Sequence, residues 1–148
     1  MSTSSGKYLI IGCGNTERGD DAAGVLVARR LRELGAHALE HSGEGLALME
    51  SWKGCDSVIL IDAVVTGAAP GAITVWDGNL APMIGDTRGC TTHAFGVAEA
   101  VELARVLGRL PHRLSIYGIE GRSFDLGGAP SQEVAEAVER LVQQLVQQ

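Results

Sequence analysis

Short apolar runs that end at a glycine or an acidic residue are the feature that most narrows the folds open to this chain. Residues 57–61 read Ser-Val-Ile-Leu-Ile and stop at Asp62, and residues 8–12 form a similar run that ends in glycine. Continuous β-branched and aliphatic runs of this length are typical of strands buried on both faces. Such strands occur in parallel sheets that helices cover from both sides, and the run at 57–61 is expected to be central.

Helical patterns alternate with these strands. Apolar residues recur every three to four positions in the segments 21–34, 46–52, 95–107 and 132–145. Asp20 and Ser131 precede two of the segments and are expected to be their N-caps. Further strands are expected at 36–40, 73–76 and 114–119. The alternation predicts an α/β fold with three layers, α/β/α, in which helices cover both faces of a twisted, mostly parallel five-stranded sheet.

One connection is too short for a parallel crossover. Only ten residues lie between Asp62 and Ile73, with two glycines, one proline and no helical pattern, whereas a crossover needs about a dozen or more. The strand at about 73–77 is therefore expected to run antiparallel to the others. The segment 77–92 would then return the chain to the carboxyl edge of the sheet, where a helix follows His93.

Composition limits the classes of function. A chain of 148 residues, 45% hydrophobic and 20% charged, fits a single domain over residues 1–148, with residues 1–6 disordered. The net charge of -6 argues against a nucleic-acid partner. No apolar run approaches the about 20 residues of a membrane span, and the N-terminus lacks the apolar region of a signal peptide. We expect a cytoplasmic protein that does not engage membranes, with reduced thiols, because its three cysteines form no CxxC pattern.

Three polar residues are expected to meet at the carboxyl edge of the sheet: Asp21, Asp62 and His93. Two carboxylates and one imidazole with open positions suit a divalent ion such as nickel, iron or zinc. There is also a plainer interpretation, in which neither residue binds a metal. The negative charge of Asp21 would then only interact favourably with the dipole at a helix N-terminus, and His93 would only be a polar residue at a helix start. Cys90 could add a soft ligand or a nucleophile. The other histidines, His37, His41 and His112, fit no cluster and are expected at the surface or at strand ends.

Several familiar sites are disfavoured. The Gly-Cys-Gly-Asn loop at 12–15 lacks the third glycine of a dinucleotide fingerprint, because Glu17 stands in its place, and two carboxylates open the following helix. The chain has neither the HExxH motif of zinc proteases nor the GxSxG motif of serine hydrolases. An open site of carboxylates and imidazole remains.

A string of motifs extends this pattern over nearly the whole chain. It comprises the loop 12–15, Arg-Gly-Asp-Asp at 18–21 with Gly24, Ser-Gly-Glu-Gly at 42–45, Ile-Asp-Ala at 61–63, Thr-His at 92–93, Gly-Ile-Glu at 118–120, and Phe124, Gly127 and Ser131. In order and spacing these motifs resemble the hydrogenase maturation endopeptidase family, which trims the C-terminal extension from the nickel-loaded large-subunit precursor of nickel-iron hydrogenases. Ala22 and Asp21 depart from the glycine and glutamate that some members have.

The resemblance implies roles for particular residues. Asp21, Asp62 and His93 would recognise the metal, and the two aspartates would be catalytic. Gly43, Glu44 and Gly45 would line the groove that receives the substrate's tail. Nickel would arrive bound to the precursor, so that no tightly held metal of the protein's own is expected.

Two other classes of function stay open. One is a non-catalytic chaperone that senses nickel in the same precursor, and the other is a small-molecule hydrolase or nucleotide-binding protein on the same fold. The sequence also leaves open whether a carboxylate or the metal activates the attacking water.

Overall fold

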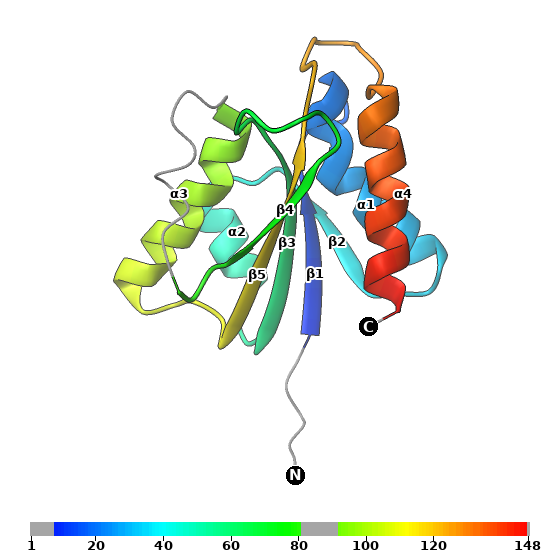
Figure 1. Ribbon diagram of the computed structural model, residues 1–148. Coiled ribbons are helices and arrows are strands. Elements are labelled where there is room, and N and C mark those ends of the chain that lie inside the picture. The colour runs from blue at the N-terminus through cyan, green and yellow to red at the C-terminus, as the bar shows by residue number, and fades with distance from the viewer. Residues whose placement is uncertain (1–7, 81–91, 148) are drawn as a thin grey trace.

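Five strands form one sheet at the centre of the protein (Figure 1). The structure, a computed structural model, describes residues 8–80 and 92–147, and the side chains of residues 92–96 are outside the description. The predicted disorder of residues 1–6 and the position of Cys90 therefore lie outside the described residues. The strands are β1 (Tyr8–Cys13), β2 (Ala38–His41), β3 (Ser57–Val64), β4 (Ile73–Asp77) and β5 (Arg113–Glu120).

The strand order is β2-β1-β3-β5-β4, with β3 in the centre as expected. Pairing is parallel between β1 and β2, between β1 and β3 and between β3 and β5, whereas β4 pairs antiparallel with β5. The antiparallel strand predicted at 73–77 is thus confirmed. The short connection after β3 can only turn back, because it has no room for a helix.

The helices divide between the two faces of the sheet (Figure 1). A 3-10 helix, η2 (Gly19–Ala22), leads directly into α1 (Ala23–Glu33), which packs with α4 (Gln132–Val146) on one face. The other face is covered by α2 (Gly45–Ser51) and α3 (Thr92–Leu107). The three-layer α/β/α architecture is confirmed. Within the described ranges, no helix combines the length and apolarity that crossing a membrane requires.

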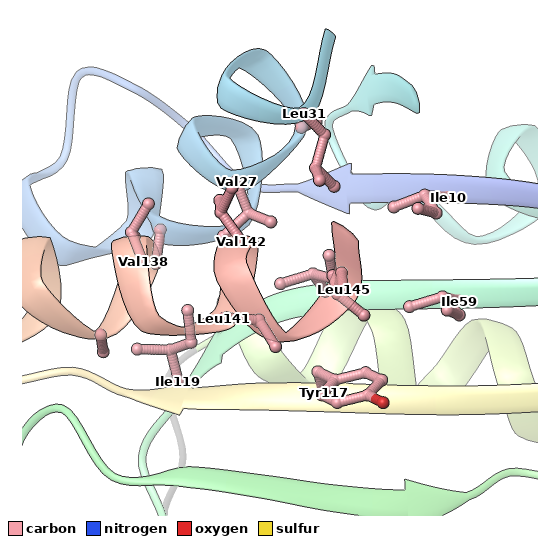
Figure 2. Packing of buried hydrophobic residues seen from close by; sticks show 14 of the residues in the cluster. Ile10, Val27, Leu31, Ile59, Tyr117, Ile119, Val138, Leu141, Val142 and Leu145 are labelled. Carbon is pink, nitrogen blue, oxygen red and sulfur yellow. The ribbon is translucent and has the colours of Figure 1, made fainter. Parts of the chain in front are cut away.

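Side chains alternate along the strands and build a core on each face. Figure 2 shows the face under α1 and α4, where Ile59 and Tyr117 of the sheet meet Leu141 and Leu145 of α4. Each aliphatic side chain fully buried in this way contributes about 1.5–3 kcal/mol. On the opposite face, Leu60 packs in the cluster that α2 and α3 cover.

Strand β3 is longer than the sequence predicts. It continues to Val64, so Asp62 lies inside the strand rather than directly after it. Because successive side chains of a strand point to opposite faces, Asp62 shares the face of Leu60, under α2 and α3.

Close packing between α1 and the sheet depends on Gly24. A Cβ built on Gly24 would lie 2.2 Å from the carbonyl oxygen of Ile61 and 2.4 Å from that of Cys13. Only a residue without a side chain lets α1 begin this close to β1 and β3. The contact sets the start of α1, and with it η2, against the strand position next to Asp62.

Candidate active site

A cavity of about 650 Å³ opens at the carboxyl edge of the sheet, beside β1 and β2. Its lining includes Asp21 of η2, Asp62 of β3 and His41 at the end of β2, together with Gly43 and Glu44 before α2. The two carboxylates are 1% and 2% exposed. The structure therefore brings Asp21 and Asp62 together, at the edge where the sequence places them.

The Asp62 carboxylate is buried with few compensating contacts. One oxygen, Oδ1, accepts a hydrogen bond from the N–H of Ala63 (2.9 Å), whereas Oδ2 has no hydrogen-bond partner among the described residues. Burial raises the pKa of Asp62 well above its ordinary value, and the nearby charge of Asp21 raises that pKa further. A buried carboxylate in this state is costly unless a proton or a cation completes it.

Asp21 is held in place by the loop that precedes it. Its Oδ2 accepts the backbone N–H of Asn15 (3.0 Å), and its own N–H donates to the carbonyl of Arg18 (3.0 Å). The N–H of Asn15 also approaches the Asp21 carbonyl (3.2 Å). Because Asp21 occupies this amide of the loop, the loop offers less to a phosphate group than a dinucleotide fingerprint does.

Asp20 is not a helix cap, contrary to the prediction. It lies within η2, is 0% exposed and accepts hydrogen bonds from the loop that connects β5 to α4. Ser131 does occupy the N-cap position of α4, but its hydroxyl makes no capping hydrogen bond and donates to Asp20 instead (2.9 Å). The partners of Asp20 are more than 100 positions away in the chain, beyond the reach of local capping rules.

The position of His93 is known only from the backbone. Helix α3 begins at Thr92, earlier than predicted, so His93 lies in its first turn. One turn later, Val97 approaches the cavity lining, because a Cβ built on Gly43 would be 3.6 Å from its Cγ2. The start of α3 is therefore at the same end of the sheet as the two carboxylates. A contact between His93 and the carboxylates stays a prediction.

His41 lines the cavity, although the sequence indicated no cluster for it. Its strand-end position is as expected, and its Nδ1 accepts the N–H of Gly43 (2.9 Å). In the neutral ring this bond leaves the hydrogen on Nε2. The missed signal is that β2 and β1 end side by side, with His41 in register with Cys13.

The predicted substrate-binding segment divides into different environments. Gly43 is buried and, with Glu44, lines the cavity, whereas Gly45 is the first residue of α2 and is not part of the lining. The Glu44 carboxylate caps α2 by accepting the N–H groups of Leu46 (3.0 Å) and Ala47 (3.4 Å). Contact of the three residues with substrate stays a prediction.

In the parts of the chain that the structure describes, no three metal-ligating side chains form one group. Asp21 and Asp62 offer carboxylate oxygens from two elements, which is an incomplete ligand set for a transition metal. Such a pair can contact an ion that other ligands already hold.

Comparison with known proteins identifies the family of the chain. A family model described as hydrogenase maturation protease matches residues 36–148. The chain is 28% identical over 145 residues to the hydrogenase expression/formation protein HupM of Azotobacter chroococcum mcd 1, covering 94% of this chain and 69% of that protein. It is 25% identical over 135 residues to the hydrogenase 2 maturation protease of Escherichia coli (strain K12), covering 86% of this chain and 82% of that protein.

Two solved structures share the fold. The [NiFe] hydrogenase maturation protease HycI from Thermococcus kodakarensis KOD1 superposes with a TM-score of 0.71 at 28% identity, covering 95% of this chain and 90% of that one. The hydrogenase maturating endopeptidase HybD from E. coli gives a TM-score of 0.78 at 23% identity, covering 94% and 89%. By the family match and the shared fold, the chain belongs to the hydrogenase maturation protease family and is a hydrolase that acts on peptide bonds.

Proposed function

We propose that the protein removes the C-terminal extension of the nickel-loaded large-subunit precursor of a nickel-iron hydrogenase. The observation that carries this proposal is the buried Asp62 carboxylate beside Asp21 at the wall of the cavity, with one oxygen that no described group satisfies. The names of the similar proteins indicate hydrogenase maturation as the process. The incomplete ligand set fits a metal that arrives with the substrate.

Asp21, Asp62 and His93 are assigned to contact the nickel that the precursor holds. A cation between two buried carboxylates offsets their repulsion and the desolvation of Asp62. The same contact distinguishes a loaded precursor from an empty one, because an empty precursor brings no cation that could offset the repulsion between the two carboxylates. The protein needs no tightly held metal of its own for this purpose.

Asp62 is assigned to accept the proton of the water that attacks the scissile bond. Burial, and next the charge of Asp21, raise its pKa, so this carboxylate holds a proton more strongly than an exposed aspartate does, which suits a general base. The water oxygen then bonds to the peptide carbonyl carbon, and the proton passes to the departing amine as the C–N bond breaks. Asp21 is catalytic by holding the nickel and the substrate beside Asp62.

The tail of the precursor is assigned to the groove beside Gly43, Glu44 and Gly45. Gly43 has a φ of +91° and is buried against β1 and α3. An extended peptide can approach closely where the chain has no side chain, and backbone groups can then bind it.

Incubation of the purified protein with nickel-loaded or empty precursor tests the proposal, with the mass of the large subunit as the readout. We expect loss of the extension only from the loaded precursor. Asp62→Asn should abolish this cleavage, because an amide is a poor ligand and no base. Binding of the loaded precursor without any change of mass would favour the nickel-sensing chaperone instead.

His93→Ala tests the metal contact separately. We expect this variant to lose its discrimination between loaded and empty precursor, measured by the gel shift of the large subunit. His37→Ala is the matched control, because His37 is exposed, precedes β2 at the opposite end from His41 and is not part of the cavity lining. Unchanged discrimination in His93→Ala would remove His93 from the contact.

A further inference from the structure

We propose that Asp20 is a positioning residue, which fastens η2 to the loop between β5 and α4 and so fixes the Asp21 carboxylate at the cavity. That Asp20 fastens η2 to this loop is argued from hydrogen bonds alone. Its consequence for cleavage rests on the function proposed for Asp21.

The Asp20 carboxylate is the centre of a hydrogen-bond cluster. Oδ1 accepts the N–H of Ser131 (2.6 Å), and Oδ2 accepts the N–H of Arg122 (2.7 Å), the hydroxyl of Ser131 (2.9 Å) and the N–H of Ser123 (3.1 Å). All four donors belong to the loop 121–131. Although burial raises the pKa of Asp20, these hydrogen bonds lower it overall, so the carboxylate stays ionised and keeps its four acceptor contacts.

Backbone hydrogen bonds join the same two segments around Asp20. The N–H of Asp20 donates to the carbonyl of Ser123 (2.8 Å), that of Gly19 to Gly128 (3.0 Å), and that of Gly127 to Glu17 (2.6 Å). Figure 1 shows the loop after β5 beside the turn that leads into α1. The loop before Asp21 is thus fastened to a segment more than 100 residues later in the chain.

Asp20 acts on the site through its neighbour. Asp20 and Asp21 are consecutive residues of one 3-10 turn, so a shift of Asp20 moves the backbone that carries Asp21. Asp20 itself is not part of the cavity lining, and its oxygens are engaged by the loop. It is therefore distinct from the groups that contact nickel. Displacement of a reacting group by about 1 Å can lower a rate about 100-fold.

Asp20→Asn tests the carboxylate with little change of shape. If the amide oxygen takes the place of Oδ2, the amide NH₂ faces the N–H of Ser131, two donors without an acceptor. The matched control is Glu120→Gln. Glu120 is also buried, at 3% exposure, and its carboxylate accepts the N–H and hydroxyl of Thr66 and the N–H of Gly67, which belong to a different loop.

The first measurement is amide hydrogen exchange of the full chain, without substrate. The reporter is the N–H of Asn15, which donates to the Asp21 carboxylate. In Asp20→Asn we expect its protection to fall by about tenfold or more relative to amides of β3, and in Glu120→Gln by less than about threefold. Unchanged protection of Asn15 in Asp20→Asn would overturn the proposal, whatever the activity.

The second measurement is the cleavage kinetics of the nickel-loaded precursor. We expect kcat of Asp20→Asn to fall by about tenfold or more, with KM changed by less than about threefold, because the docking surface is intact and only the site is displaced. Equal losses of kcat in Asp20→Asn and Glu120→Gln would reduce Asp20 to a purely structural role and overturn the proposal. If the unaltered protein does not cleave the precursor, the proposed function fails, and the exchange of Asn15 still decides the role of Asp20.

Ser131→Ala keeps the test decisive if Asp20→Asn does not fold. This variant removes one of the four donors, the hydroxyl at 2.9 Å, and leaves the backbone donors in place. We expect a smaller change in the same direction, about threefold, in the protection of Asn15. No change in Ser131→Ala would then contradict the proposed coupling.

Discussion

Gly14 and the main-chain oxygen of Asp21 lie so close that a Cβ built on Gly14 would be 2.0 Å from that oxygen. Gly14 also has a φ of +146°, a conformation that residues with side chains rarely adopt. This glycine, directly after β1, thereby makes room for the backbone of η2. In the sequence, Gly14 is part of a motif that resembles a nucleotide-binding loop, whereas in the structure it lets the backbone of Asp21 pack close to the end of β1.

Gly14→Ala should therefore displace Asp21. We expect the free energy of unfolding to fall by about 1–3 kcal/mol, and the clash to add to that loss. Precursor cleavage, measured by mass at a temperature where the variant is folded, should fall by about tenfold or more. The matched control is Gly54→Ala, where φ is +82° and nothing lies within 4 Å of the new Cβ. Equal cleavage by the two variants would contradict this role of Gly14.

Asp62→Asn should make the protein more stable at neutral pH. The pKa of Asp62 is raised in the folded state, mainly by burial and further by Asp21, so the folded protein loses stability as the pH rises from the ordinary value of 3.8 through the raised value. An amide cannot ionise and escapes this loss. The stability advantage of the variant should thus be small near pH 4, grow with pH and level off above the raised pKa.

Urea unfolding at a series of pH values measures this advantage. Asp56→Asn is the control, because Asp56 is exposed before β3 and a neutral residue there relieves no buried charge. An advantage of Asp62→Asn that is constant from acid to neutral pH would mean that Asp62 titrates like an exposed aspartate.

The fold was predictable because its signals are local. The β-branched run before Asp62 predicts a buried strand, and the ten residues that follow it are too few for a crossover, which fixed the direction of the strand at 73–77. The end of β3 was not predictable in the same way. An acidic residue after an apolar run usually marks a strand end, but here the chain continues to Val64 with Asp62 buried, because the site holds that carboxylate at the edge of the core.

The roles of individual side chains depended on contacts that no local pattern contains. Asp20 precedes an amphipathic helix and therefore predicts a cap, yet its partners are in a loop more than 100 residues away. His41 joins the cavity because β1 and β2 end side by side. Asp21 and Asp62 could be placed because Asp21 comes soon after β1 and Asp62 lies near the end of β3, and the carboxyl ends of these parallel strands share one edge of the sheet.

Cys13 should be the least reactive of the described cysteines. Burial raises the pKa of its thiol well above the ordinary value, and the charges of Asp62 and Asp21 raise it further, so little thiolate forms at pH 8. Cys55 is partly exposed. In timed alkylation with iodoacetamide, followed by peptide mass mapping, we expect Cys55 to react well before Cys13. Labelling in urea is the control, because both cysteines are exposed in the unfolded protein and should react at similar rates. Equal rates in the native protein would contradict the buried state of Cys13.

Glu44 should prove to have a capping role that can be separated from any contact with substrate. Its carboxylate accepts two N–H groups at the start of α2, so Glu44→Ala should lower the free energy of unfolding by about 0.5–2 kcal/mol. Glu44→Gln keeps an acceptor oxygen and removes the charge, and should lose less stability. KM for the nickel-loaded precursor then reports the second role, because a charge that binds the tail is absent in both variants. If KM rises only in Glu44→Ala, the effect comes from the lost cap of α2. An equal rise of KM in both variants would assign the Glu44 charge to substrate binding.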